Sequence, residues 1–209
     1  MDDTDNPNNR PTDVKITVVG ESGVGKSSLS QRIVYDNFPL EGKITIGAAY
    51  LVIKKIKSGY TYKLNFWDTA GQEKYKSLVP MYIKGANIVL LVFDITNRNS
   101  LMEIKKSWYE YSMKYAELST KILVGTKTDL DTRTVTSEEA LEFALFRNMK
   151  YVECSAKMNF NVDKIVEIIL GSISPVLPPN IPLKLDEDSE DEVDKKIETC
   201  MGGNRCYTY

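Results

Sequence analysis

A glycine-rich segment, residues 20–27 with the sequence GESGVGKS, constrains this chain more than any other feature. It follows a short apolar run at residues 14–19 and precedes a segment with helical character. In a GxxxxGK[ST] loop the glycines let backbone N–H groups turn towards phosphate oxygens, and the N-terminus of the next helix favours negative charge. A glycine-rich turn with a chance Lys-Ser pair is the alternative. The strand and helix around the segment favour a nucleotide phosphate site.

The residues of this segment would share the work of holding a nucleotide. Lys26 would reach the β- and γ-phosphates, and the Ser27 hydroxyl would ligate Mg²⁺. Further contacts would come from the loop and the first helical turn, through Ser22, Gly23, Val24, Gly25 and Ser28. The segment alone therefore predicts a site for a nucleoside triphosphate and Mg²⁺ but does not identify the base.

The composition narrows the chemistry that such a site can perform. The chain has no histidine, which excludes imidazole general bases, Ser-His-Asp and Cys-His triads and the commonest zinc ligand. Catalysis must use backbone amides, lysine, hydroxyl groups, carboxamides and a hard metal ion. The sequence contains no basic stripe for nucleic acid, no disulfide framework and no apolar run that would span a bilayer. We expect a cytoplasmic protein.

Short apolar runs alternate with helical patterns, which predicts a parallel sheet covered by helices on both faces. Strands are expected at residues 14–19, 48–56, 61–67, 88–93, 122–124 and 151–154, and helices at 28–35, 101–115, 136–146 and 162–169. The Ser58-Gly59 turn joins the second and third strands as a hairpin. The predicted class is therefore a three-layer α/β/α fold with a mostly parallel sheet and one antiparallel edge strand.

Composition also divides the chain into three parts. Residues 1–12 are rich in Asp, Asn and Pro and are expected to be disordered. Residues 13–174 form the α/β domain. Four prolines end regular structure after it, and residues 175–209 are expected to form a flexible acidic tail.

One helical stripe admits two interpretations. Large apolar and aromatic side chains recur at helical spacing at Leu101, Ile104, Trp108, Tyr111 and Tyr115. An exposed aromatic recognition stripe is one possibility. A helix face turned towards the core is the interpretation we favour.

Polar and glycine residues follow the ends of four predicted strands, at Gly20, Asp68, Thr126 and Ser155. Ligands of parallel α/β sheets bind beyond the carboxyl ends of the strands. We therefore expect these four positions, which are far apart in sequence, to meet at one site.

The motifs at these positions together resemble the Ras superfamily of small GTPases, over about residues 13–172. Stretches similar to the Rab branch lie at residues 46–50, 63–73 (KLNFWDTAGQE) and 75–86 (YKSLVPMYIKGA). The amino-acid sequence at residues 48–50 and 79–82 is most similar to that of endosomal Rabs. The resemblance implies a P-loop G domain that binds GTP or GDP with Mg²⁺.

The same resemblance implies roles on the phosphate side of the site. Thr45 would complete the Mg²⁺ shell and contact the γ-phosphate only when GTP is bound, and Asp68 would hold Mg²⁺ through water. Gly71 would let a backbone N–H approach the γ-phosphate, and Gln72 would orient the attacking water. Ordinary turn residues are the alternative for Thr45 and for Asp68-Thr69, and only the neighbouring motifs argue against it.

The base would be selected by two further motifs, Thr126-Lys127-Thr128-Asp129 and Ser155-Ala156-Lys157. Asp129 would accept hydrogen bonds from guanine N1–H and the exocyclic amine, and the Ala156 N–H would donate to guanine O6. Adenine would leave the carboxylate unpaired, which disfavours it by on the order of 10⁴. The stem of Lys127 and the ring of Phe38 would sandwich the base, unless Phe38 is simply a core aromatic.

Thr126 departs from the family pattern, which usually has Asn here. An Asn carboxamide bonds both the base and the phosphate loop, whereas Thr carries a shorter hydroxyl. Losing one such bond weakens binding by roughly 0.5–1.5 kcal/mol. We expect guanine preference with faster nucleotide release than in a typical Rab.

The C-terminus also departs from the pattern, because Rabs usually end in paired prenylated cysteines. Cys206 stands fourth from the end, but Thr208 and the terminal Tyr209 match a prenylation box poorly. Cys200 would be a second lipid site. Two unmodified thiols in a disordered tail are the alternative, because the motif fit is partial. One lipid chain beside an acidic segment anchors weakly, so stable attachment would need two lipids or a partner.

By resemblance, the expected function is a GTP-binding switch that hydrolyses GTP slowly without a GAP and regulates vesicle or endosomal trafficking. Its protein partners would be a GAP, an exchange factor and effectors. A prenyl anchor would attach it to the cytoplasmic face of vesicle or endosomal membranes. Nucleic acid is not expected as a partner. Effectors would bind a surface that includes Ile46, Phe66, Trp67 and Tyr82.

The alternative functions are a nucleotide-loaded scaffold with little hydrolysis and an ATP-using P-loop kinase. The kinase leaves the Asp68–Gln72 and Ser155–Lys157 motifs unexplained.

Overall fold

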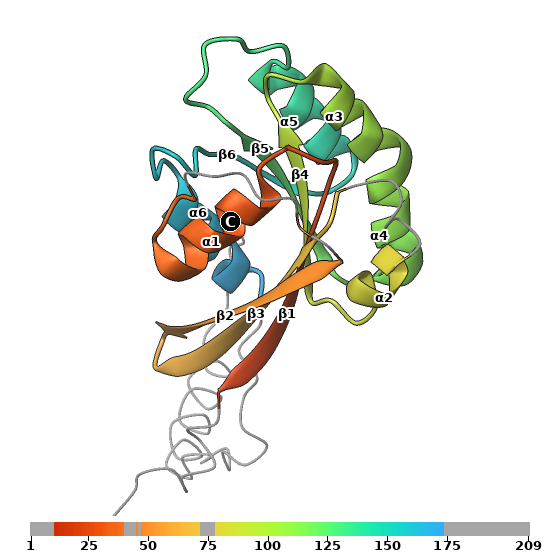
Figure 1. The fold of residues 1–209 in the computed structure, drawn as a ribbon. Helices are drawn as coiled ribbons and strands as arrows, with labels where there is room; N and C mark the ends of the chain where they lie inside the picture. The colour runs from red at the N-terminus through yellow and green to blue at the C-terminus, as the bar shows by residue number, and fades with distance from the viewer. Residues whose placement is uncertain (1–10, 40–44, 46, 72–77, 174–209) are drawn as a thin grey trace, which may run out of the picture. The chain divides into compact units, whose positions relative to one another are not determined.

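The computed structural model describes residues 11–39, 45, 47–71 and 78–173 (Figure 1). All of them belong to the first of the two units into which the chain divides, Met1–Pro175. Four positions with predicted roles lie outside the described residues, namely Ile46, Gln72, Cys200 and Cys206. The same is true of the predicted acidic tail and of most of the N-terminal segment.

Within the described residues, six strands form one sheet in the order β2-β3-β1-β4-β5-β6. Their bounds are β1 Thr12–Val19, β2 Ala48–Lys57, β3 Tyr60–Thr69, β4 Ile88–Asp94, β5 Thr120–Thr126 and β6 Lys150–Glu153. Strands β2 and β3 pair antiparallel, and the other neighbouring pairs are parallel. The predicted antiparallel edge is therefore confirmed.

Helices cover both faces of the sheet, with α1 and α6 on one side and α3, α4 and α5 on the other (Figure 1). Their bounds are α1 Lys26–Tyr35, α2 Val79–Ile83, α3 Arg98–Glu103, η4 Ile104–Trp108, α4 Tyr109–Tyr115, α5 Ser137–Phe146 and α6 Val162–Gly171. The three-layer α/β/α fold that the sequence predicts is confirmed. The short helix α2 was not predicted.

Strand β4 shows why the sequence has apolar runs instead of alternating patterns. Every side chain of β4 is buried. Ile88, Leu90 and Val92 belong to the core under α1 and α6, whereas Val89 and Leu91 belong to the core under α3 to α5. Successive side chains of a strand point to opposite faces, so a strand covered on both faces is apolar at successive positions, here from Ile88 to Phe93.

The stripe from Leu101 to Tyr115 faces the core, as favoured. Leu101, Ile104 and Trp108 are fully buried, and the rings of Tyr111 and Tyr115 pack against the same cluster. The segment is not one continuous α-helix, however. Its middle turn, η4, is a π-helix in which the Tyr109 N–H donates to the Ile104 carbonyl. The helical spacing did not reveal this wider turn.

Two predicted strand ends lie further along the chain than expected. Asp68 and Thr69 belong to β3 and not to a loop, because both pair with β2 and Asp68 also pairs with β1. Thr126 is likewise the last residue of β5 and pairs with the end of β4. Asp68 and Thr126, which were expected to follow strands, are therefore strand residues themselves, whereas Gly20 and Ser155 do lie beyond the ends of β1 and β6.

Candidate nucleotide site

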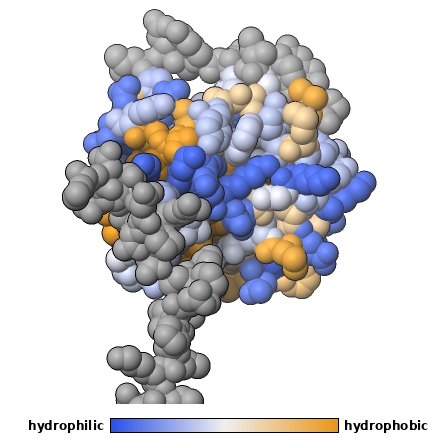
Figure 2. Space-filling view, turned by 90° about the horizontal axis from the view of Figure 1, so that it is seen from below, coloured by the Kyte–Doolittle hydropathy of each residue, from blue (hydrophilic) through white to orange (hydrophobic). Residues whose placement is uncertain are grey.

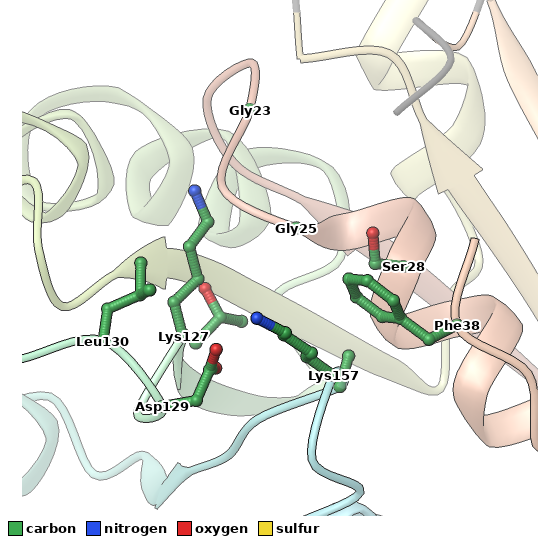
Figure 3. A pocket seen from close by; sticks show the side chains of 10 residues that line it. Gly23, Gly25, Ser28, Phe38, Lys127, Asp129, Leu130 and Lys157 are labelled. Carbon is green, nitrogen blue, oxygen red and sulfur yellow. The ribbon is translucent and has the colours of Figure 1, made fainter. Parts of the chain in front are cut away.

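The predicted site residues meet beyond the carboxyl ends of the parallel strands. A pocket of about 330 Å³ lies there (Figure 3). Its lining comes from the phosphate loop and α1, from the segment after α1 and from both predicted base motifs, through Gly23, Gly25, Ser28, Phe38, Thr126, Lys127, Asp129, Leu130, Ala156 and Lys157. Of these, only Leu130 was not predicted.

The phosphate loop depends on the absence of a side chain at its first position. Gly20 has φ of 148° at the end of β1, and a Cβ there would collide with the Val92 carbonyl oxygen of β4. The loop is thus pressed against the sheet. Gly25 adopts φ of 95° as the N-cap of α1, so the first N–H groups of the helix face the site and favour an anion.

Lys26 is buried at the base of this loop. Its Nζ donates to the carbonyl oxygens of Gly20 at 2.9 Å and Glu21 at 2.7 Å. Burial lowers the pKa of Lys26 to about 8, although the charges of Asp68 and Glu21 oppose the change. A desolvated ammonium group of this kind is suited to pair with phosphate oxygens.

Ser27, Thr45 and Asp68 converge beside Lys26. The Ser27 and Thr45 hydroxyl oxygens lie 2.8 Å apart. Burial raises the pKa of Asp68, while hydrogen bonds from both hydroxyls and the Lys26 charge oppose the rise. The Asp68 Oδ1 atom is buried and has no hydrogen-bond partner among the described residues.

This donor set fits Mg²⁺. Hydroxyl and carboxylate oxygens are hard ligands, and Mg²⁺ is held by one or two carboxylates together with substrate phosphates and water. A buried carboxylate oxygen without a partner is unfavourable, and a cation would remove that penalty. The described residues contain no cluster of three or more His, Cys, Asp or Glu side chains, so a cation held by protein carboxylates alone is not indicated in this part of the chain.

Gly71 lies directly against the phosphate loop. A Cβ at this position would lie 2.5 Å from the carbonyl carbon and oxygen of Glu21 and would also collide with Lys26 Nζ. Only glycine allows the backbone to come this close. The next residue, Gln72, lies outside the described residues.

Asp129 is oriented by Ser155, the first residue of the second base motif. The Ser155 hydroxyl donates to Asp129 Oδ1 at 2.6 Å and accepts from the Met158 N–H at 3.0 Å. Figure 3 shows the Asp129 carboxylate at the pocket, with Phe38 and Lys127 on opposite sides of it. Phe38 is only partly buried and belongs to neither core cluster, which favours the role in base binding over that of a core aromatic.

The Thr126 hydroxyl of β5 lies between the phosphate loop and β4. Its oxygen is 2.6 Å from the Val24 carbonyl oxygen and 2.9 Å from the Phe93 carbonyl oxygen, so its single proton is shared between these two acceptors. The shorter side chain thus keeps the contact with the phosphate loop that an Asn would make. The contact with the base is the part of the family interaction that Thr126 would lose.

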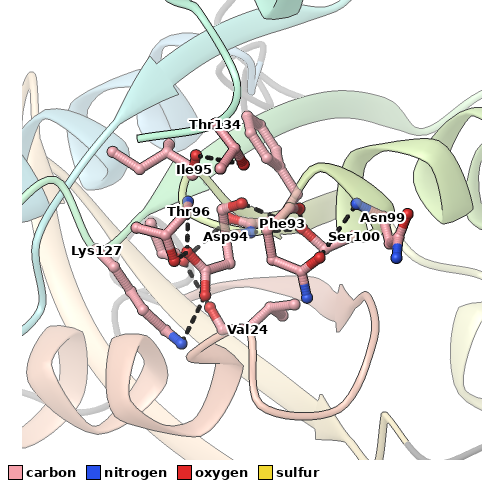
Figure 4. A network of polar contacts seen from close by, with 11 residues as sticks. Val24, Phe93, Asp94, Ile95, Thr96, Asn99, Ser100, Lys127 and Thr134 are labelled. Carbon is pink, nitrogen blue, oxygen red and sulfur yellow. Dashed lines mark hydrogen bonds and ion pairs between the residues drawn. The ribbon is translucent and has the colours of Figure 1, made fainter. Parts of the chain in front are cut away.

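Sequence reasoning missed Asp94, the last residue of β4. Its Oδ2 lies 2.7 Å from Lys127 Nζ, and its Oδ1 accepts from the Thr96 N–H and hydroxyl at 2.8 and 2.7 Å (Figure 4). Burial alone would raise the pKa of Asp94, but the bonds from Lys127 and Thr96 outweigh it and lower the pKa. Lys127 has φ of 65°, so its ion pair helps to hold a backbone conformation that side chains disfavour.

Arg32 of α1 was also missed, and no local sequence signal points to it. Its Nε donates to the Ala156 carbonyl at 2.8 Å, and a terminal nitrogen donates to the Asp36 carbonyl at 2.7 Å. The guanidinium group therefore ties the loop that would present the Ala156 N–H to the helix that follows the phosphate loop.

The predicted reader surface needs one correction. Phe66 is fully buried, because it lies on the opposite face of β3 from Trp67. The aromatic surface instead consists of Tyr50, Trp67 and Tyr82, with ring centroids 5.0 Å apart for Tyr50–Trp67 and 5.9 Å apart for Trp67–Tyr82. Tyr50, on the edge strand β2, is half exposed.

Fold and site together define a P-loop protein with the motif order of a small GTPase. A model of the Ras family matches residues 15–174, and the chain belongs to this family. Rab-18-B of Danio rerio is 41% identical over 165 residues, which cover 76% of this chain and 80% of that protein. Rab-1 of Theileria annulata is 38% identical over 174 residues, which cover 80% of this chain and 79% of that protein. RABF2b of Arabidopsis thaliana is 38% identical over 175 residues, which cover 83% of this chain and 88% of that protein.

The chain is accordingly a Rab-type small GTPase, a GTP-binding switch of membrane trafficking in a family that binds guanine nucleotide and Mg²⁺. None of its described helices is long and apolar enough to cross a membrane. On the face shown in Figure 2, hydrophilic side chains predominate and apolar ones gather in a few separate groups.

Proposed function

We propose that this chain is a GTP-timed switch on vesicle or endosomal membranes, whose GTP-bound form is read by effector proteins. Two contacts of the phosphate loop carry the proposal. Ser27 bonds Thr45, and the Glu21 backbone lies against Gly71. Because these contacts hold Thr45 and Gly71 beside Lys26, a γ-phosphate would add contacts to both segments that GDP cannot make, and its loss would weaken their hold on the site.

Phosphoryl transfer requires mainly positioning and charge neutralisation, and the site supplies both without histidine. Ser27, Thr45 and Asp68 would hold Mg²⁺, which draws charge from the phosphate oxygens when bound. Lys26 would pair with the β- and γ-phosphates. Gln72 would orient the attacking water.

A GAP would supply the charge that the described residues do not place at the γ-phosphate. Ser22 is small and exposed at the tip of the phosphate loop, which leaves space for an arginine from outside. Small GTPases of this class are slow without such an arginine and faster by 10³–10⁵ with it. We expect a Ser22→Val variant to retain GTP binding and to lose most of its response to a GAP.

Guanine would be selected by Asp129 and by the Ala156 N–H. Ser155 fixes the Asp129 carboxylate and Arg32 fixes the Ala156 peptide, so both groups are positioned before the base arrives. Lys127, Phe38 and Lys157 would surround the base plane. An exchange factor would have to disturb these contacts to release GDP.

Effectors would bind the aromatic surface of Tyr50, Trp67 and Tyr82. Its side chains are only partly buried, and aromatic residues are enriched at interface hot spots. Gly47 connects this surface to the nucleotide site: a Cβ there would lie 3.8 Å from the Tyr82 hydroxyl, and its carbonyl accepts from the Ala70 N–H. Movement of the segment around Thr45 would thereby reach the surface.

Attachment to a membrane would use Cys206, with Cys200 as a second lipid site. The acidic residues upstream would be repelled by anionic lipid, so two lipid chains or a partner protein would be required. Mass spectrometry of the protein from its own cell tests this. Detection of both cysteines unmodified would exclude the lipid anchor.

Hydrolysis of GTP and ATP by the wild type and a Gln72→Leu variant tests the proposed function. We expect slow hydrolysis of GTP, none of ATP, and a loss of at least tenfold in the variant. Little hydrolysis of GTP by either protein would instead indicate a nucleotide-loaded scaffold, and GTP hydrolysis that does not depend on Gln72 would contradict the proposed switch. Proteins captured by the GTP-loaded variant and not by the GDP-loaded wild type would identify effectors and the membrane compartment.

A further inference from the structure

The π-helical turn η4 brings a buried tryptophan to the phosphate loop. The indole Nε1 of Trp108 donates to Glu21 Oε1 at 3.0 Å, although the two residues are 87 positions apart in the sequence. Trp108 is fully buried. A π turn is rare and occurs often at functional sites.

Glu21 is the residue at which three parts of the site meet. Its backbone carbonyl accepts from Lys26 Nζ at 2.7 Å. The same peptide group lies so close to Gly71 that a Cβ there would come within 2.5 Å of it. Its side chain accepts the bond from Trp108. A shift of Glu21 would therefore move the carbonyl that orients Lys26 and the surface that supports Gly71.

The opposite side of this contact is rigid. Ile104 and Trp108, the first and last residues of η4, are fully buried in the core under α3 to α5, and the Tyr111 ring lies against the Trp108 ring with centroids 6.3 Å apart. A hydrogen bond from a fixed buried donor restrains its acceptor, and a bond made to a charged group is stronger than one between neutral groups.

We propose that Trp108 is a positioning residue for GTP hydrolysis. It fixes Glu21, and through Glu21 the start of the phosphate loop and the place of Gly71 beside the γ-phosphate. The π turn presents the indole N–H to the loop while the ring stays in the core. Through Glu21 the bond supports Gly71, which would lie beside the γ-phosphate that GDP lacks, so we expect Trp108 to act on the chemical step more than on the retention of GDP.

The test compares single-turnover GTP hydrolysis with GDP release in three variants. Trp108→Phe keeps a buried ring and removes the N–H donor. Glu21→Ala removes the acceptor, and Glu21→Gln keeps an acceptor oxygen without the charge. We expect hydrolysis to fall roughly three- to tenfold in Trp108→Phe and Glu21→Ala, with release of GDP changed less than twofold. Glu21→Gln should recover most of the rate.

A double variant and a control make the result decisive. If the two residues act through one bond, Trp108→Phe combined with Glu21→Ala is no slower than either alone. Tyr111→Phe removes a polar atom from the ring packed on Trp108 and should hydrolyse GTP at the wild-type rate. A lowered melting temperature in Trp108→Phe with an unchanged hydrolysis rate would overturn the proposal, as would multiplicative effects in the double variant. Failure of the proposed switch is distinguishable, because it would appear as wild-type hydrolysis that does not depend on Gln72.

Discussion

The carboxylate of Asp94 holds the ammonium group of Lys127 at 2.7 Å, across the ends of two adjacent parallel strands. The pair holds the charged end of Lys127 on Asp94, while Lys127 itself lines the pocket. The aliphatic part of the Lys127 side chain is thereby free to pack against a nucleotide base. An ion pair can serve a site in this way without touching the ligand.

An Asp94→Asn variant should release GDP about two- to tenfold faster, because Lys127 loses its ionic partner while its stem keeps the same atoms. The range corresponds to roughly 0.5–1.5 kcal/mol, reduced from that of a fully buried pair because Lys127 is one-third exposed. Stopped-flow release of a fluorescent GDP measures it. Glu139→Gln, which breaks the ion pairs with Arg98 and Lys105, is the matched control and should leave the rate unchanged. An unchanged rate in Asp94→Asn would refute the role.

Two substitutions of Thr126 should change the rate of GDP release in opposite directions. Thr126→Asn should slow GDP release two- to tenfold, because the carboxamide adds a bond to the base. Thr126→Val should speed it, because the Val24 and Phe93 carbonyls lose their hydroxyl donor. The same fluorescence assay separates the two. Equal release from Thr126→Asn and the wild type would mean that the hydroxyl already supplies all that the family's Asn provides.

Arg32→Ala should loosen the loop that presents Ala156. Without the bond from Arg32 Nε, the Ala156 carbonyl has to find water, and we expect two- to tenfold weaker GDP binding by titration calorimetry. Preference for guanine over adenine should weaken but remain, since the Ala156 N–H loses its support while Asp129 and Ser155 are untouched. Arg98→Ala, on an exposed ion pair, provides the comparison. Loss of guanine preference in Arg32→Ala would contradict this division of roles.

Lys26 predicts a particular dependence of stability on pH in protein stripped of nucleotide. Its pKa is about 8 when folded, against an ordinary value of 10.5, so between these values the unfolded chain binds more protons. The free energy of unfolding should therefore rise with pH from 8 to 10.5. Below pH 8 the buried charge destabilises the fold by up to about 3 kcal/mol.

A Lys26→Met variant tests this linkage by urea denaturation. Without nucleotide, the variant should be more stable than the wild type at pH 7, and the difference should shrink towards pH 10.5. With GDP and Mg²⁺ the order should reverse, because methionine offers phosphate no positive charge. A constant difference across this pH range would show that Lys26 does not titrate as described.

The parts of the site that could be predicted are those encoded in contiguous motifs. The phosphate loop, Asp129 and Ala156 are local patterns on strand ends, and the order of strands brings them together. Trp108–Glu21 and Arg32–Ala156 join residues 87 and 124 positions apart. Neither pair leaves a periodic or compositional trace, because each is a single contact between surfaces that only the folded chain places side by side.

The assignment of Phe66 to the reader surface was a different kind of error. Phe66 and Trp67 are adjacent on a strand, so they cannot share a face, and the sequence alone could have excluded one of them. The predicted end of the strand at residue 67 is two residues too early, and the reason is physical. Polar residues normally suggest a loop, but here partners on both β1 and β2 keep them in the sheet.

The contact between Trp108 and Glu21 also provides a spectroscopic probe. The chain contains two tryptophans. One indole lies on the outer aromatic surface, and the other is buried with its N–H on the phosphate loop. In a proton–nitrogen correlation spectrum the two side chains would give two separate signals in an uncrowded region. A single label would then follow the phosphate loop and the aromatic surface of Tyr50, Trp67 and Tyr82 in the same sample as GTP is converted to GDP.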